Sequence, residues 1–194
     1  STTHTDHVVS TEFKSAGSKV AYIAAATKEN GLPCFDSIKA TYEKVEALID
    51  EKKVKSAWVV GFGGVAEGIF KMGLGNQLGF TFETELTDAQ LYKPAAAAFL
   101  LEMDEVPADM ICLGTVTAEY ALTYKGETVC MNALQKPYED KLQSVFPYLT
   151  PSKNETVTAY RATGERITAP RKIAQPRVLI PVFPGTNCEY DTAR

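Results

Sequence analysis

Histidine is scarce in this sequence, and this scarcity excludes several enzyme classes. The 194 residues include only two histidines, His4 and His7, both in the polar N-terminal segment STTHTDHVV. No serine or cysteine in the rest of the chain therefore has a histidine base beside it, which excludes a hydrolase triad. For the same reason we interpret Cys188, in the segment PGTNCEYD, as a structural thiol and not a nucleophile. We predict no catalytic residue within this chain.

Paired cysteines are also missing. Cys34, Cys112, Cys130 and Cys188 are far apart in the sequence and never form a CxxC pair. This spacing argues against a zinc site and against a redox pair, so we interpret all four as reduced thiols. The spacing HTDH at residues 4–7 could hold a metal ion, but a polar terminus is usually mobile. We predict no metal site.

Long apolar runs and an excess of positive charge are lacking as well. No stretch approaches the roughly 20 apolar residues that span a bilayer, and the N-terminus has neither the basic region nor the apolar stretch of a signal peptide. The net charge of −4 provides no positive field for nucleic acid or anionic lipid. With 45% hydrophobic and 23% charged residues, the composition is that of a folded globular protein. We expect a cytoplasmic protein that binds neither nucleic acid nor membrane.

The hydrophobic patterns predict a sheet with helices packed on it. The predicted strands lie at residues 7–13, 19–25, 56–62, 78–83, 97–105, 110–118 and, as a hairpin turning at Lys125 and Gly126, 120–131. The predicted helices lie at residues 36–53, capped by Asp36 or Ser37, at 63–75, ended by Gly73 and Gly75, and at 137–147, with a loop or short helix at 87–93. These elements follow no strict βαβ rhythm. We therefore predict a mixed α/β (α+β) fold with a sheet of four to six strands, and not a Rossmann sheet.

A glycine-rich turn is the strongest candidate binding site. The strand SAWVVG runs into Gly61, Gly63 and Gly64 and then into a helix. Unpaired N–H groups and the helix dipole at such a helix N-terminus favour a phosphate, so we predict that these three glycines bind phosphate or nucleotide. The pattern is neither GxGxxG nor GxxxxGK[ST]. The alternative is that the glycines only permit a tight turn and close helix packing, with Glu67 stabilising the dipole.

The composition changes near residue 150. Residues 150–176 have few large apolar side chains and many Thr, Lys, Arg and Pro, which predicts a linker without regular secondary structure. RVLIPVFPG then reads as a strand and a Pro-Gly turn, the way a new α/β domain begins. We expect this strand, which lacks a sheet of its own, to pair with an exposed sheet edge or another molecule.

The motifs resemble a known enzyme family. The C-terminal PRVLIPVFPGTNCEYDTAR closely resembles the opening strand and turn of the glutamine amidotransferase domain of phosphoribosylformylglycinamidine synthases. Upstream, VVSTEFKSAGSKVAYI, GFGGVAEGIFKMGLGNQLGF, and FLLEMDE followed by ICLGTVT resemble the C-terminal domain of the aminoimidazole-ribonucleotide (AIR) synthetase superfamily. The resemblance implies an AIR-synthetase-related C-terminal domain at 1–149, a linker at 150–176 and a truncated class I amidotransferase start at 177–194. The chain, which opens on serine, is then an excised piece.

What the family does sets further expectations. The full enzyme couples ATP cleavage to conversion of formylglycinamide ribonucleotide and glutamine into the amidine, and Mg²⁺ stabilises the transferring phosphoryl group. The resemblance implies that the partners are the ATP-binding synthetase domains and the glutaminase domain of the same chain. Their functional residues lie outside this segment, so we expect the isolated chain to be inactive and to hold neither ATP nor Mg²⁺ tightly.

The glycine turn departs from the family pattern. Members often carry DxSDGGL at this point, whereas this chain reads VGFGGVAEG. The aspartates are missing, so only the paired glycines, Gly63 and Gly64, are carried over from the family. Any metal or polar-ligand role of the aspartates is not.

Three functions stay open on the sequence. The domain could complete an ATP or substrate-phosphate pocket together with a partner half. It could instead be a packing and channel module without a ligand of its own. It could also be the C-terminal half of another superfamily member, such as a selenophosphate-synthetase-like or thiamine-phosphate-kinase-like enzyme, although the amidotransferase start argues against this third function.

Overall fold

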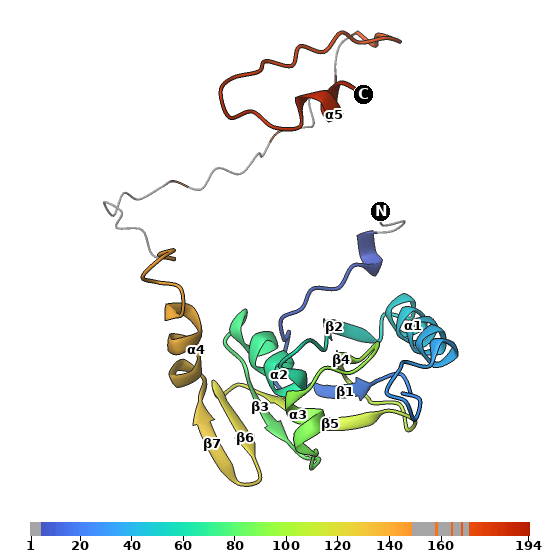
Figure 1. Cartoon of the computed structure of the whole chain (residues 1–194), viewed down its shortest axis with the longest axis vertical. Coiled ribbons are helices and arrows are strands. Elements are labelled where there is room, and N and C mark those ends of the chain that lie inside the picture. Colours follow the sequence, from blue (N-terminus) through green and yellow to red (C-terminus); the bar gives the residue numbers. More distant parts are fainter. Residues whose placement is uncertain (1–4, 149–157, 159–163, 165–167, 169–170) are drawn as a thin grey trace. The chain divides into compact units, whose positions relative to one another are not determined.

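A seven-stranded mixed sheet forms the centre of the N-terminal part of the protein (Figure 1). The computed structural model describes residues 5–148, 158, 164, 168 and 171–194, and the chain divides into two units, Ser1–Thr150 and Pro151–Arg194. The strands are β1 (Lys19–Ile23), β2 (Val54–Val59), β3 (Gly79–Phe82), β4 (Phe99–Met103), β5 (Ile111–Thr117), β6 (Ala121–Tyr124) and β7 (Glu127–Cys130).

The strand order is β2-β4-β1-β5-β3-β6-β7. Every neighbouring pair is antiparallel except β3 and β6, which run parallel. This confirms the predicted mixed α+β fold, with one strand more than the largest number expected. The sharp turn between β6 and β7 explains why the hairpin could be recognised, because Lys125 and Gly126 both have positive φ, at 51° and 83°.

Helices cover both faces of the sheet, so that it is the middle of three layers. The helices of this unit are η1 (Thr5–His7), α1 (Phe35–Asp50), α2 (Gly64–Leu74), α3 (Asp88–Tyr92) and α4 (Met131–Asp140). On one face α1 packs Val45 and Leu48 against Leu101 and Met103 of β4. On the other face α2 and α3 bury a larger cluster with β1, β3, β4 and β5.

The strands β1 and β4 explain why both faces of the sheet need a cover. β1 presents Val20 and Tyr22 to the α2 side and Ala21 to the α1 side, and β4 divides Leu100 and Leu101 in the same way. Successive side chains of a strand point to opposite faces, so a strand that is apolar throughout must be buried on both. The result is a sheet held by two apolar clusters.

The structure corrects two of the predicted elements of this unit. Residues 8–13 form no strand, because their backbone groups bond singly to different elements instead of following one neighbouring strand. The predicted helix at 137–147 is wrong in its bounds: α4 begins at Met131, whose side chain is fully buried, and Pro137 lies inside it. Pro137 suggested a helix start because proline favours the first helical position.

Helix ends differ as well. Cys34 is the N-cap residue of α1 and makes no side-chain cap bond, whereas the predicted cap Ser37 accepts a hydrogen bond from Ala26 N–H (2.8 Å). α2 ends at Leu74 with Gly75 as its C-cap residue, where a glycine was expected to end it, whereas Gly73 lies within the helix; Gly75 has right-handed φ and ψ, so it does not form a left-handed cap.

The C-terminal unit has one described helix, α5 (Glu189–Ala193). The predicted strand at 177–183 is not formed. Pro181 removes a backbone donor from its middle, and Val178 and Leu179 are exposed, with no strand in the described part of this unit to pair with. Most of the predicted linker at 150–176 lies outside the described residues. Among the residues that the structure describes, every helix is too short or too polar to cross a bilayer.

Candidate functional site

The three predicted site glycines lie together in the turn between β2 and α2. After β2, Val60 N–H still donates to Ala98 O (2.9 Å), and the chain then leaves the sheet. Gly64 N–H donates to Gly61 O (3.1 Å), which closes the turn, and α2 begins at Gly64 with Gly63 as its N-cap residue. The turn therefore sits at the positive end of the α2 dipole.

The N-terminus of α2 is already capped by a side chain of the same helix. Glu67 Oε2 accepts a hydrogen bond from Gly63 N–H (2.8 Å), and Glu67 Oε1 accepts one from Lys71 Nζ (2.6 Å). The Lys71 ammonium and, second, the Gly63 N–H hold the pKa of Glu67 below its usual value. The same pairing with Glu67 raises the pKa of Lys71. An anion that bonds Gly63 N–H would have to displace this carboxylate.

Gly64 allows α2 and α3 to approach closely. Its φ is +68°, and a Cβ there would lie 2.4 Å from Leu91 O and 2.7 Å from Tyr92 N. No real Cβ occupies such a position, so the residue must be glycine for both its conformation and its contacts. The other two glycines face Glu67: a Cβ on Gly63 would lie 2.5 Å from Glu67 Cβ, and one on Gly61 would make ordinary contact with its carboxylate.

Two structural features of α2 were missed by the sequence analysis. The first is Gly68, where a Cβ would lie 2.5 Å from Leu100 Cδ1, so this glycine lets α2 rest on β4. The second is Lys71, which lies two turns into the helix and away from the glycines. The i, i+4 spacing of Glu67 and Lys71 is the signal that could have found this ion pair.

Aromatic side chains surround the Lys71 ammonium group. Its Nζ lies 5.7 Å from the centre of the Trp58 ring and 5.6 Å from that of Tyr138, within the range of cation–π attraction. Tyr138 belongs to α4 and also meets Phe70 of α2 edge-on (5.5 Å). These contacts fix α4 to α2 and hold Lys71 in the position from which it bonds Glu67.

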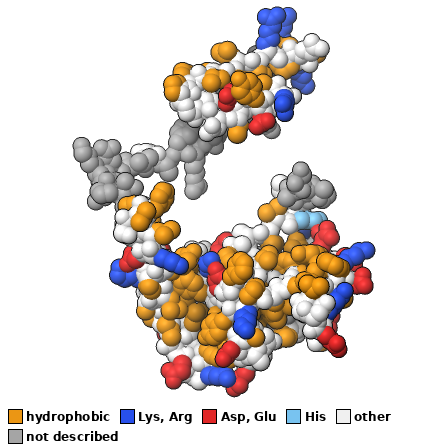
Figure 2. All heavy atoms as spheres, viewed as in Figure 1, with side chains coloured by type: hydrophobic (Ala, Val, Ile, Leu, Met, Phe, Trp, Pro, Cys, Tyr) orange, Lys and Arg blue, Asp and Glu red, His pale blue; other side chains and the backbone are white. Residues whose placement is uncertain are grey.

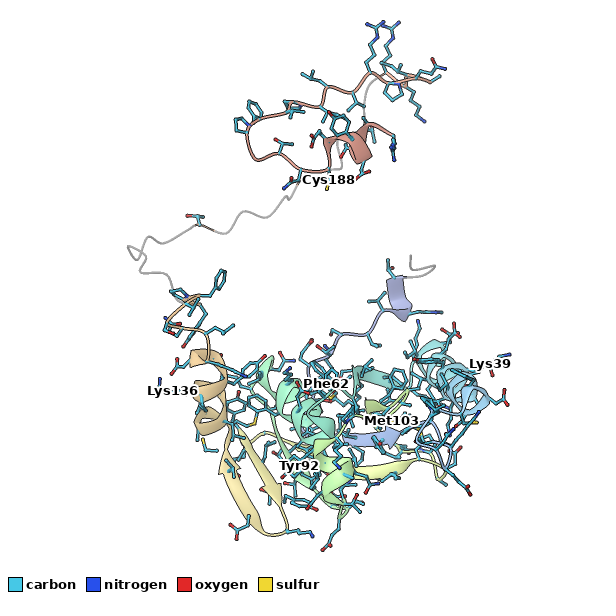
Figure 3. The ribbon with its side chains drawn as sticks, viewed as in Figure 1. Lys39, Phe62, Tyr92, Met103, Lys136 and Cys188 are labelled. Atoms are coloured by element: carbon cyan, nitrogen blue, oxygen red, sulfur yellow. The ribbon has the colours of Figure 1, made fainter. Side chains whose placement is uncertain are left out.

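Exposed apolar side chains lie beside the turn. Phe62 within the turn is 91% exposed, and Tyr92 at the end of α3 is 62% exposed (Figure 3). An apolar hollow of about 390 Å³ adjoins α2 and α3 and is lined by Ala66, Leu91, Leu122, Tyr124 and Val129, among others. Figure 2 shows hydrophobic side chains gathered on this face. The surface around the turn is thus better suited to contact with protein than to a solvated phosphate.

A second hollow, of about 490 Å³, is larger but lies away from the glycine turn. Its lining includes Lys52, Lys53, Lys55 and Asp104 at the ends of β2 and β4. Lys55 already pairs with Asp104 and reaches the hydroxyls of two serines. We interpret the lining of this second hollow as a solvated cluster of paired charges.

The remaining candidate residues do not come together. His7 bonds Asp50 (2.8 Å), while His4 lies outside the described residues. All four cysteines are free thiols, and Cys188 is exposed at the start of α5. Within the described part of the chain, no group of three His, Cys, Asp or Glu side chains is arranged to hold a metal ion.

Comparison with known proteins shows the fold. No protein-family model matches the sequence, and no curated protein matches it. Solved structures from Thermotoga maritima do match. PurL complexed with FGAR matches with a TM-score of 0.55 and 14% sequence identity, over 67% of this chain. Phosphoribosylformylglycinamidine synthase II matches with a TM-score of 0.55 and 14% identity, over 80% of this chain. PurLQS matches with a TM-score of 0.54 and 14% identity, over 84% of this chain.

The chain spans about 30% of the length of these structures: 30%, 30% and 32%. At this identity the likeness establishes a shared architecture, the AIR-synthetase-like fold. The architecture agrees with the fold that the sequence motifs led us to expect.

Proposed function

We propose that this chain is the last synthetase-type domain of a phosphoribosylformylglycinamidine synthase, followed by a linker and the start of its glutamine amidotransferase domain. The boundaries we propose are 1–149, 150–176 and 177–194. The observation that carries the proposal is the segment PRVLIPVFPGTNCEYDTAR, which follows a domain whose fold matches PurL. Structures of that PurL protein were solved with FGAR, with ATP and with ADP.

The whole enzyme would form a C–N bond with glutamine as the amido donor and ATP as the energy source. In the proposed assembly this domain works beside ATP-binding synthetase domains and a glutaminase domain of the same polypeptide, in the cytoplasm. The described residues do not fit ATP–Mg²⁺ by themselves. Both carboxylate oxygens of Glu67 are engaged, and no acidic cluster among the described residues lies near the turn.

Within that enzyme, we assign this domain a packing role at the glycine turn. Gly64 brings α3 against α2, Glu67 occupies the helix N-terminus, and the exposed Phe62 and Tyr92 offer an apolar surface to a neighbouring domain. The alternative, that Gly61, Gly63 and Gly64 bind phosphate or nucleotide, draws support from the positive end of the α2 dipole at the turn. Binding of a phosphate to Gly63 N–H would require the Glu67 carboxylate to move aside.

The two roles are distinguished by an anion titration. The one tryptophan of the chain, Trp58, contacts Lys71 and reports on the turn by fluorescence. The packing role predicts no saturable response to inorganic phosphate or ADP in the wild-type chain or in the variant Glu67→Gln, followed by fluorescence for phosphate and calorimetry for ADP. Saturable binding that is strengthened in Glu67→Gln would favour the phosphate site, because this change removes the competing negative charge.

The enzyme assignment has its own test. The parent protein, purified whole, should form ADP and release glutamate only when FGAR, glutamine and ATP are all present. The chain of residues 1–194 alone should do neither. Turnover by the isolated chain above a blank, or a parent protein indifferent to FGAR, would contradict the assignment.

A further inference from the structure

Residues 10–17 form a strap that crosses the α2 side of the sheet, in the blue segment between η1 and β1 of Figure 1. The strap belongs to no strand ladder. Its bonds from backbone to backbone reach three elements: from Ala57 N–H of β2 to Ser10 O (3.1 Å), from Phe13 N–H to Met72 O of α2 (2.8 Å), and from Gly17 N–H to Val116 O of β5 (2.8 Å). The ladders of the sheet close without it.

One side chain anchors the strap in the core. Phe13 is fully buried and stacks on Phe80 of β3, with ring centres 5.9 Å apart. Asn76 Nδ2 donates to Phe13 O (2.7 Å) and fixes the backbone beside this ring. The neighbours Thr11 and Lys14 are exposed, so Phe13 docks as a single apolar plug.

A buried carboxylate holds the next two residues. Glu102 of β4 has no exposed surface, and its Oε2 accepts from Lys14 N–H (2.7 Å) and from Ser56 Oγ (2.8 Å), while its Oε1 accepts from Ser15 N–H (3.1 Å). All three donors are uncharged. A buried carboxylate depends on such bonds, because losing them leaves a charge without solvent or partner. Two of the three come from the strap.

A glycine marks the end of the strap. Gly17 has φ +92°, and a Cβ placed on it would meet nothing within 4 Å. The chain can therefore change direction there without disturbing packed neighbours. Beyond it Ser18 is buried and β1 begins, paired on both sides.

We propose that residues 10–17 are a detachable strap, with Glu102 as its latch, that opens as a unit while the sheet stays folded. Opening withdraws Phe13, uncovers Phe80 and frees the backbone edge of β2 at Ala57. Local opening of this kind breaks the contacts described above and the hydrogen bond from Lys55 Nζ of β2 to Ser15 Oγ (3.3 Å), while the strand ladders stay intact.

Amide hydrogen exchange and trypsin cleavage on the whole chain test the proposal. The amides of Phe13, Lys14 and Ser15 are direct probes, and Lys14 is a tryptic site that becomes accessible on opening. In Glu102→Gln one acceptor becomes an NH₂ donor, so we expect exchange at these amides and cleavage after Lys14 to accelerate about tenfold or more. Amides of β1 and β4 should keep their wild-type rates. Glu105→Gln, at an exposed carboxylate nearby, is the matched control and should behave as wild type.

Two results would overturn the proposal. The first is wild-type exchange at the strap amides in Glu102→Gln. The second is equal acceleration in the strap and in β1 and β4, which would show that Glu102 stabilises the whole domain and that no separate opening exists. If Glu102→Gln does not fold, Asn76→Ala decides in its place. It removes only the bond to Phe13 O and should accelerate strap exchange about fivefold, again without affecting β1 and β4.

Discussion

Replacing Gly64 with alanine tests the packing role of the glycine turn. The added Cβ would lie 2.4 Å from Leu91 O and 2.7 Å from Leu91 C, both backbone atoms that cannot turn away as a flexible side chain does. The residue would also have to keep φ near +68°. Gly64→Ala therefore combines two costs, a strained backbone and a displaced α3.

The second cost can be isolated with a matched variant. Gly126, in the β6–β7 turn, has φ +83° and open space where a Cβ would lie, so Gly126→Ala carries the backbone strain alone. That strain amounts to about 1–2 kcal/mol. Overpacking against α3 adds about 1–3 kcal/mol to Gly64→Ala. The gain from restricting the unfolded chain is similar in both variants and cancels in the comparison.

Urea unfolding followed by Trp58 fluorescence measures both variants at pH 7. We expect Gly64→Ala to lose about 2–5 kcal/mol of unfolding free energy and Gly126→Ala about 1–2 kcal/mol. Equal losses within about 0.5 kcal/mol, the scatter of surface substitutions, would refute the argument that Gly64 is required by the contact with Leu91.

Three further predictions concern other parts of the chain. Glu67→Gln should lower the unfolding free energy by about 0.5–1.5 kcal/mol at pH 7. Folding lowers the pKa of Glu67, so its contribution is present above its unfolded pKa and is lost as the pH falls through the folded value. The difference between wild type and variant in urea unfolding should therefore shrink as the pH falls below 4.5, and a constant difference would contradict the cap. Phe13→Ala should cost about 3–5 kcal/mol in the same assay, because a fully buried ring is removed from its stack on Phe80, and a loss below 1 kcal/mol would show that the plug is dispensable. The sequence places a linker at residues 150–176, so limited proteolysis should cut there first; protection of that whole stretch in dilute solution would argue against a linker.

Local signals in the sequence located most of the sheet. The apolar run FLLEM correctly predicted β4. The pair Lys125-Gly126 correctly predicted the β6–β7 hairpin, because a primed turn needs residues that tolerate positive φ. The prediction of a strand at residues 7–13 was wrong because β-forming side chains do not show whether a neighbouring strand is present to pair with. A segment becomes a strand only where the edge of a neighbouring strand can pair with it. Here the backbone N–H groups of the strap donate to separate acceptors in α2, β4 and β5.

The site was predicted only as far as its position. Glycines after a strand and before a helix indicated a turn at Gly61–Gly64, and the structure places the turn there. What fills the helix N-terminus depends on a side-chain rotamer of Glu67, and what requires Gly64 depends on the approach of α3, a helix more than 20 residues later. Both are tertiary facts that no local pattern contains.

The strand order has a consequence for how the chain is made. β1 lies between β4 and β5, so neither edge of this early strand finds its partner until residues 99–117 have been synthesised. At ribosomal rates of about 5–20 residues per second, β1 waits roughly 5–20 s after emerging, with Val20 and Tyr22 not yet covered. The nascent first half of the domain therefore exposes apolar side chains for seconds before the partners of β1 exist. The hairpin of β6 and β7, whose partners are adjacent in sequence, forms within microseconds of leaving the ribosome.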